Sequence, residues 1–211
     1  MITTLPFNGH VADYEAWFEK YPFVFQSEVE AIRDMLPEGS NLYAIEIGAG
    51  TGRFAKELGI REGIEPAANM RALALKRGIN VLAGEADHLP FEDMKYDFVL
   101  MAFCISYFEN LQKAFKESYR VLKNGGSLIV GFVDKASTIG KSYEEKRSQS
   151  VFYREARFYS TKTVATELRK AGFKDLDFSQ TLFHALDYIK EFEPAEPGFG
   201  KGSFIVIRAI K

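Results

Sequence analysis

A glycine-rich turn between an apolar strand and a helix constrains this chain more than any other segment. The turn, EIGAGTG at residues 46–52, follows an apolar run at 42–45 and precedes a helical pattern at 53–58. Its glycines have the spacing G-x-G-x-G, whereas the dinucleotide fingerprint G-x-G-x-x-G needs a glycine where this chain has Arg53. No Gly-Lys-Ser/Thr follows, so the phosphate-loop pattern is absent as well. The segment therefore predicts a cofactor-binding crossover whose ligand is not held by a pyrophosphate.

An acidic residue, Glu46, begins this turn. A carboxylate attracts an ammonium group and repels a pyrophosphate. The glycines at positions 48 and 50 let the backbone approach a ligand, because a Cβ there would push the ligand away. The acid and the glycines together favour a ligand that carries an ammonium group.

Strand-like and helix-like patterns alternate from residue 42 onward. The expected strands are 42–47, 60–65, 79–83, 96–101, 127–133, 173–182 and 203–210, and the expected helices are 51–58, 67–77, 110–122 and 161–171. Such alternation is typical of an α/β fold with a parallel sheet and helices on both faces, and its ligands bind beyond the carboxyl ends of the strands. The strand at 60–65 is unusually polar and contains a glycine, which is atypical of a buried parallel strand.

Composition and charge exclude several classes of protein. The 211 residues include 27 basic and 29 acidic ones, for a net charge of −2, so nothing indicates a nucleic-acid footprint or a polybasic membrane surface. No apolar run approaches the roughly 20 residues of a membrane span, and residues 1–10 lack the pattern of a signal peptide. Cys104 is the single cysteine, which rules out an intrachain disulfide and a cysteine metal cluster and fits a reducing cytoplasm.

The length suits a single domain, 1–211, with three parts. Residues 1–40 read as a helical lid with a break at Pro22, residues 41–134 as the cofactor-binding core, and residues 135–211 as an acceptor-side insertion followed by the final strands. Residues 137–157 are polar and charged, and the mixture of basic and acidic residues at 141–157 favours a solvated helix. A short helix is expected near 184–191. The chain is expected to be a monomer or a homodimer.

Five blocks in order resemble the motifs of class I S-adenosylmethionine-dependent methyltransferases, in the group that acts mostly on small molecules. They are AIEIGAGTG at 44–52, GIEP at 63–66, GEADHLPF at 84–91 beside the family's G-D-A-x-x-L-P-F, YDFV at 96–99, and YRVLKNGG at 119–126 beside R-V-L-K-P-G-G. Asn124 replaces the usual proline of the last block. The resemblance implies a Rossmann-like, doubly wound sandwich whose seven-stranded sheet is mostly parallel with its last strand antiparallel.

The resemblance also implies which residues bind S-adenosylmethionine. Glu46 would receive the methionine ammonium directly or through water, Glu65 would accept the ribose hydroxyls, and either Glu85 or Asp87 would accept the adenine amine. Tyr14 would cover the methionine end of the cofactor. The remaining implied contacts are those of the turn and of the pocket walls: Gly48, Ala49, Gly50, Thr51, Pro66, Met70, Ala86, Leu89, Met101 and Ala102. Met70 also suits the core.

Methyl transfer from a sulfonium is an in-line displacement, so the protein mainly holds donor and acceptor in line and excludes water. No catalytic residue is obligatory unless the acceptor must lose a proton first. Candidates for the acceptor side are His10, Tyr14, Trp17, Tyr21, Phe103, Cys104, Tyr107, Phe108, Tyr143, Phe152, Tyr153 and Arg157. Aromatic walls suit a flat or apolar acceptor, although aromatics at helical spacing also suit a core. The three histidines, His10, His88 and His184, are scattered, so no metal site is expected.

The leading hypothesis is methyl transfer from S-adenosylmethionine to a small molecule. A non-catalytic, cofactor-binding regulatory or partner-binding module on the same fold is the alternative, since fold alone does not prove catalysis. A nicotinamide-dependent oxidoreductase is disfavoured by the missing third glycine. Macromolecular substrates are disfavoured by the charge balance and because MAFC, at 101–104, stands where an N-P-P-Y-type motif would follow the fourth strand.

Overall fold

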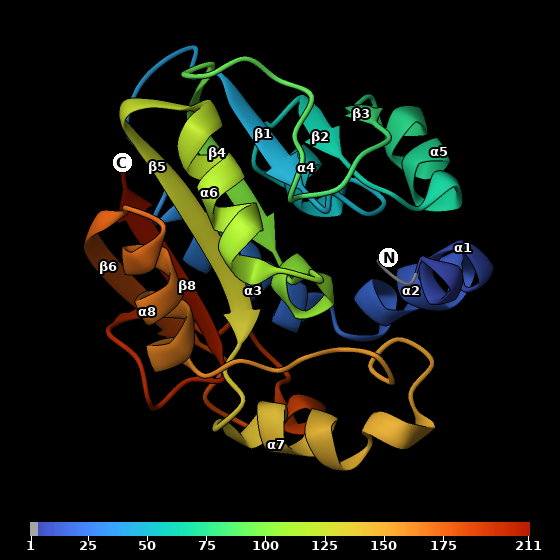
Figure 1. Ribbon diagram of the computed structural model, residues 1–211. Helices are drawn as coiled ribbons and strands as arrows, with labels where there is room; N and C mark the ends of the chain where they lie inside the picture. The colour runs from blue at the N-terminus through green and yellow to red at the C-terminus, as the bar shows by residue number, and fades with distance from the viewer. Residues whose placement is uncertain (1–3) are drawn as a thin grey trace.

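The computed structural model describes residues 4–211 and contains an eight-stranded sheet (Figure 1). The strands are β1 (Ala44–Ile47), β2 (Glu62–Ile64), β3 (Asn80–Leu82), β4 (Tyr96–Ala102), β5 (Leu122–Val133), β6 (Lys174–Thr181), β7 (Glu196–Pro197) and β8 (Phe204–Ile210). Their order is β3-β2-β1-β4-β5-β8-β6-β7, with β3 to β5 parallel and β8 antiparallel to both of its neighbours. The doubly wound α/β fold is confirmed, and its winding reverses between β1 and β4, where such sheets bind ligands.

The sheet has one strand more than the seven expected. The additional strand, β7, has two residues, and it pairs with Ser179 and Gln180 at the edge of the sheet. It includes Pro197, which cannot donate to a strand ladder and is therefore suited to an edge. A strand of two residues is too short to show the alternation of polar and apolar side chains, so the sequence does not predict β7. The antiparallel final strand, β8, is confirmed.

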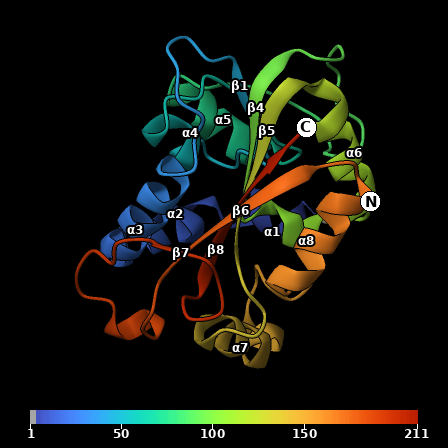
Figure 2. The same cartoon turned by 90° about the vertical axis from the view of Figure 1, so that its left-hand side faces the viewer.

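Helices cover both faces of the sheet, as Figure 2 shows with α6 and α8 opposite α3 and α4. The helices of these layers are α3 (Pro22–Arg33), α4 (Arg53–Glu57), α5 (Ala68–Lys76), α6 (Leu111–Val121) and α8 (Thr161–Lys170). Alternate residues of β4 serve the two layers: Val99 and Met101 pack with α6, and Phe98 and Leu100 pack with α3. Because β4 is buried on both faces, it appears in the sequence as a continuous apolar run.

The N-terminal segment consists of α1 (Leu5–Gly9), α2 (Val11–Lys20) and α3. The expected break at Pro22 is confirmed: Pro22 is the first residue of α3, where its missing N–H would have no helical partner in any case. Figure 1 shows α1, α2 and α7 (Thr138–Glu145) beyond the ends toward which β1 and β5 run. These helices therefore enclose the carboxyl edge of the parallel strands. Among residues 4–211, none of the helices has the length and apolarity needed to cross a bilayer.

The polar strand at 60–65 is shorter than expected, with only Glu62–Ile64 forming β2. The polar side chain of this strand, Glu62, is satisfied by hydrogen bonds. Its carboxylate accepts from the Tyr43 hydroxyl at 2.6 Å and from the Tyr96 hydroxyl at 2.9 Å. Its glycine provides space, because a Cβ on Gly63 would lie 2.8 Å from the Ala49 Cβ. The glycine lets the turn after β1 pack directly against β2.

In the C-terminal part, the long helix and strands agree with the sequence-based prediction, whereas the segments between them differ from it. Helix α8 follows the Ser160 cap, whose hydroxyl accepts from the Thr163 N–H at 3.2 Å, as expected. The helix expected near 184–191 is a single 3₁₀ turn, η3 (Leu186–Tyr188). The expected solvated helix of 141–157 is instead the end of α7, a second 3₁₀ turn η2 (Arg147–Gln149) and irregular chain.

Candidate functional site

The turn after β1 is held in a conformation that needs glycine. Gly48, Gly50 and Gly52 have φ angles of 70°, 53° and 77°, in the left-handed region. A Cβ on Gly48 would also lie 2.4 Å from the Cβ of Cys104. The Gly48 N–H donates to the Ile64 carbonyl at 2.8 Å, which ties the turn to the end of β2. The turn is a close backbone approach that side chains would block.

Glu65 lies immediately after β2 and is 7 % exposed. One carboxylate oxygen accepts from the Gly50 N–H at 3.0 Å and the other from the Ala67 N–H at 2.8 Å. Burial raises the pKa of this carboxyl, although both hydrogen bonds act in the opposite direction. Each oxygen keeps a further lone pair, so Glu65 can still accept ligand hydroxyls.

Glu46 is 1 % exposed and lies beneath the turn. Its carboxylate accepts from the N–H of Ala55, the third residue of α4, at 2.9 Å. Burial raises its pKa well above the ordinary range, and the charge of Glu65 adds to the rise. The structure therefore gives Glu46 a role as a cap of α4, one layer below the ligand-facing surface.

A cavity of about 230 Å³ lies against the turn at the carboxyl edge of the sheet. The residues expected to bind the cofactor that line this cavity are Tyr14, Gly48, Gly50, Glu65, Pro66, Met70, Glu85, Ala86 and Ala102. The expected residues outside its lining are Glu46, Ala49, Thr51 and Met101. One cavity therefore brings together residues from four strand ends and from the N-terminal helices.

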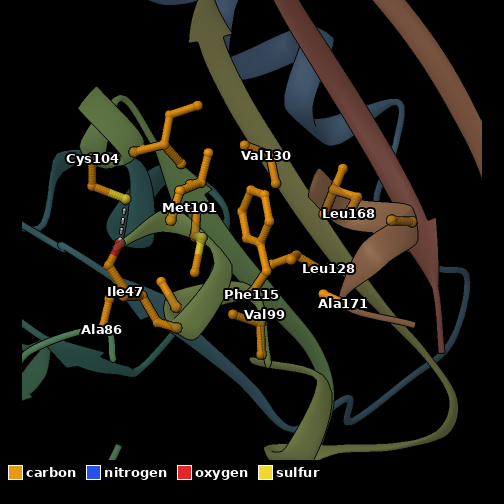
Figure 3. Packing of buried hydrophobic residues seen from close by; sticks show 14 of the residues in the cluster. Ile47, Ala86, Val99, Met101, Cys104, Phe115, Leu128, Val130, Leu168 and Ala171 are labelled. Atoms are coloured by element: carbon orange, nitrogen blue, oxygen red, sulfur yellow. Dashed lines mark hydrogen bonds between the residues drawn. The ribbon is translucent and has the colours of Figure 1, made fainter. Parts of the chain in front are cut away.

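The residues outside the lining have other partners. The Thr51 hydroxyl donates to Glu15 at 2.6 Å, and Ala49 packs against Gly63. Met101 is fully buried in the same core cluster as Phe115, as Figure 3 shows, rather than on the cavity floor. Alternation along β4 explains the difference, because the next residue, Ala102, faces the other way and does line the cavity.

Cys104 lies in η1 (Cys104–Tyr107) and lines the cavity under Gly48. Its thiol donates to the Ile47 carbonyl at 3.0 Å (Figure 3). Burial raises its pKa well above the ordinary range, and the charges of Glu46 and Glu65 raise it further. Because the thiolate is the reactive form, Cys104 is a packing residue rather than a nucleophile.

On the side expected to hold adenine, the structure separates the two candidate acids. Glu85 is exposed and lines the cavity together with buried Ala86, whereas Asp87 lies outside the lining. The His88 N–H donates to the Glu85 carbonyl at 3.3 Å, so the chain turns between them. Leu89 is buried in the core and is also outside the lining.

Tyr14 of α2 covers the glycine turn. Its hydroxyl lies 3.4 Å from the position that a Cβ on Gly50 would occupy. Burial raises the pKa of the phenol, and the charges of Glu46 and Glu65 contribute. A neutral hydroxyl therefore faces the turn. The Tyr14 ring lies 6.2 Å from that of Phe152, which continues the aromatic lining toward α7.

A partly buried cluster of charged residues fixes α2 over the turn. One oxygen of Glu15 accepts from Thr51, and the other accepts from Arg53 at 2.7 Å and from Arg77. The side chains of Glu15, Arg53 and Arg77 are 17 %, 23 % and 19 % exposed. The carboxylate and the two guanidinium groups are shielded from water together, so removing one partner is unfavourable for the others. The cluster holds Tyr14 in position over Gly50.

Glu15→Gln is expected to lower the free energy of unfolding near neutral pH by about 1–3 kcal/mol, because both arginines lose their counter-charge. Burial alone would raise the pKa of Glu15, but hydrogen bonds from Arg77 and Arg53 lower it to about 2. This stabilisation is complete above the ordinary value of 4.5 and is lost as the pH falls through about 2. Denaturant titrations across that range should therefore show a steeper acid loss for the wild type than for Glu15→Gln. Glu19→Gln, an exposed position on α2, is the control, and equal slopes for all three proteins would contradict the expectation.

The sequence patterns missed Glu28, which is 2 % exposed and lines the cavity from α3. Its Oε2 has no hydrogen-bond partner among the described residues, and burial raises its pKa well above the ordinary range. The signal for it is its spacing: Val24, Glu28 and Ile32 are four residues apart, so the acid occupies the buried stripe of the helix. Other lining residues that were not expected are Thr4, Phe7, Asp13, Phe18, Ile47, Phe54, Ile64, Gly84, Ser106, Phe132, Val133 and Phe158.

The charged side chains that line the cavity are all acidic. They belong to Asp13, Glu28, Glu65 and Glu85, and none of the described lining residues is Lys, Arg or His. Of the acceptor-side candidates, those outside the lining are His10, Tyr21 and Arg157. Within residues 4–211, no three His, Cys, Asp or Glu side chains are arranged to hold a metal. The cavity therefore favours cationic and neutral ligands over anions.

Comparison with known proteins agrees with this geometry. A family model described as a methyltransferase domain matches residues 45–130. The crystal structure of an S-adenosylmethionine-dependent methyltransferase from Thermotoga maritima, described as a possible histamine N-methyltransferase, is 45 % identical, covers 98 % of both chains and has a TM-score of 0.94. This chain belongs to the S-adenosylmethionine-dependent methyltransferases. S-adenosylmethionine is its cofactor.

Two further relatives define the extent of the similarity. An uncharacterized protein of Methanocaldococcus jannaschii is 40 % identical over 205 residues, which is 97 % of this chain and 98 % of that protein. Phosphoethanolamine N-methyltransferase 2 of Haemonchus contortus, solved with S-adenosylmethionine, is 19 % identical with a TM-score of 0.65 over 89 % of this methyltransferase and 52 % of that chain, a likeness of fold alone. The described site fits the cofactor, because the Gly50 cradle and the all-acidic lining suit a ligand with two positively charged groups.

Proposed function

We propose that this methyltransferase transfers the methyl group of S-adenosylmethionine to a small-molecule acceptor. The observation that carries the proposal is a cavity lined both by Gly48, Gly50 and Glu65 and by many aromatic side chains. These aromatic residues include several beyond those assigned to the cofactor, and apolar walls with few polar groups are typical of small-molecule sites. The reducing cytoplasm remains the proposed location, because the chain has one cysteine.

Within this proposal, the turn and the strand ends hold the cofactor. Glu65 would accept the ribose hydroxyls, and the Gly48 and Gly50 backbone would leave room for the methionine part. Pro66, Met70 and Ala86 would form the apolar walls around adenine, and Glu85 would accept its amine. Glu46 would act from beneath the turn, by capping α4 and holding the turn in place, rather than by contact with the cofactor. Residues 1–40 would serve as the lid, 41–134 as the cofactor core and 135–211 as the acceptor side.

When bound, S-adenosylmethionine supplies the electrophilic methyl group and a neutral leaving group. The chain contributes position and exclusion of water: Tyr14 and Trp17 of α2 cover the site, and Phe152 closes it from the side of α7. Holding two reactants in line in this way contributes about 7–11 kcal/mol at best. No side chain on the cavity is required to act on the methyl group itself.

The test is a search for product. The full chain is incubated with a deuterium-labelled methyl donor and an extracted metabolite pool, and mass spectrometry detects small molecules that gain the labelled methyl group. Heat-denatured protein and excess S-adenosylhomocysteine are the controls. Labelled product that depends on native protein supports the proposal. A protein that binds S-adenosylhomocysteine but yields no labelled small molecule would instead be a cofactor-binding regulatory or partner-binding module.

A further inference from the structure

The carboxylate of Glu28 lacks the partners that a buried acid normally has. It is 2 % exposed, its Oε2 has no hydrogen-bond partner among the described residues, and it lines the cavity. Buried carboxylates are otherwise paired with a cation or satisfied by several donors. An unpartnered acid facing a ligand cavity indicates that the ligand supplies the partner.

Aromatic side chains share the cavity lining with this acid. The Tyr143 and Tyr153 rings are stacked with centroids 4.6 Å apart, and the Phe158 ring lies 5.8 Å from that of Tyr153. Burial raises the pKa of both tyrosines, and the charge of Glu28 adds to each rise, which places the acid within electrostatic reach of these rings. A carboxylate beside aromatic faces is the combination that binds organic ammonium ions.

Glu28 belongs to the acceptor end of the cavity rather than to the cofactor end. The tyrosines whose pKa the charge of Glu28 raises, Tyr143 and Tyr153, belong to the segment that follows β5, which is the expected acceptor side. Glu28 also extends from α3, whereas Glu65 follows β2. The positive partner of Glu28 is therefore expected on the acceptor and not on the cofactor.

We infer that the acceptor is a small amine, bound as its ammonium ion by Glu28 beside the rings of Tyr143 and Tyr153. Before its nitrogen takes the methyl group, the ammonium gives one proton to the Glu28 carboxylate, because only the free amine has the lone pair that attacks. The proposed methyl transfer is presupposed, since the acceptor must share the cavity with the cofactor. The described lining offers no Lys, Arg or His, so any cationic partner of Glu28 in the cavity has to come from the ligand. A carboxylate or phosphate on the acceptor would meet only acids and is disfavoured.

The test compares three ligands of nearly equal shape: phenethylamine, 2-phenylethanol and phenylacetate. Histamine and tryptamine extend the amine set to other ring sizes. Each is titrated calorimetrically into the full chain saturated with S-adenosylhomocysteine. At least one amine is expected to bind about tenfold or more tightly than the alcohol, because a charge-assisted hydrogen bond is gained, and phenylacetate is expected to bind more weakly than either.

Glu28→Gln should remove this preference by lowering the amine affinity about tenfold or more. It should leave the S-adenosylhomocysteine affinity within about twofold of wild type and should not lower the unfolding temperature, since no hydrogen bond of Glu28 is lost. Glu30→Gln, on the same helix with a surface ion pair to Arg33, is the matched control and should bind like wild type.

Three results would overturn the inference: an unchanged amine affinity in Glu28→Gln, no amine binding to a protein that binds S-adenosylhomocysteine, or an alcohol or acid preferred over every amine. A loss of S-adenosylhomocysteine binding in Glu28→Gln would also overturn it, by assigning Glu28 to the cofactor. Wild-type protein that fails to bind S-adenosylhomocysteine would instead contradict the proposed function itself.

Discussion

Glu65→Gln is expected to weaken S-adenosylmethionine binding by roughly 10–100-fold, because hydrogen bonds to a carboxylate contribute about 1.5–3 kcal/mol. Gln keeps one acceptor oxygen but places an amide NH₂ against either the Gly50 or the Ala67 N–H, both of which Glu65 now satisfies. The variant therefore loses ligand contacts and also loosens the glycine turn. Calorimetric titration with S-adenosylhomocysteine measures the change.

The control for this prediction lies on β2, the strand that ends just before Glu65. Glu62 accepts hydrogen bonds from Tyr43 and Tyr96 and is not part of the cavity lining, so Glu62→Gln should affect stability while leaving cofactor affinity close to wild type. Equal affinities for Glu65→Gln and wild type would show that Glu65 does not hold the cofactor.

Gly48→Ala is expected to lower the free energy of unfolding by about 2–5 kcal/mol, from backbone strain of about 1–2 and overpacking of about 1–3. The strain arises because φ is 70°, and the overpacking arises because the new Cβ would lie 2.4 Å from the Cys104 Cβ. Urea titration of the cofactor-free protein measures the loss without any contribution from ligand binding.

Gly59→Ala separates the two causes. Gly59 has a similar φ of 72°, but nothing lies within 4 Å of an added Cβ, so only the backbone strain of about 1–2 kcal/mol is expected. If Gly48→Ala and Gly59→Ala cost the same, the close contact between the turn and Cys104 does not contribute to stability.

Much of the fold can be predicted because its sequence signals are local. Continuous apolar runs such as β4, cap residues such as Ser160, and the proline that begins α3 each identify an element without reference to the rest of the chain. The two-residue β7 could not be predicted, since its pairing with β6 depends on a loop that brings Pro197 to the edge. The polarity of β2 is likewise explained only by partners from other elements, Tyr43 and Tyr96.

The same distinction applies to the candidate site. Gly48, Gly50 and Glu65 follow directly from a strand end, so a motif fixes their place near the ligand. Thr51 is also in the motif, yet its hydroxyl is directed to Glu15, a residue of α2 that the motif does not contain. Glu28 is in no motif; its spacing places it on the buried stripe of α3, but its place on the cavity wall depends on how α3 packs against the sheet. Contacts between distant segments therefore determine the roles of side chains that a sequence motif does not specify.

The most direct test of the central claim is the destination of a labelled methyl group in a whole-cell extract. Tritiated S-adenosylmethionine and the native chain are added, and the label is divided by size filtration into small-molecule and macromolecular fractions, with unreacted donor removed. Methyl transfer to a small acceptor predicts label in the small-molecule fraction that S-adenosylhomocysteine suppresses. Label in the macromolecular fraction, or none beyond the donor, would contradict it.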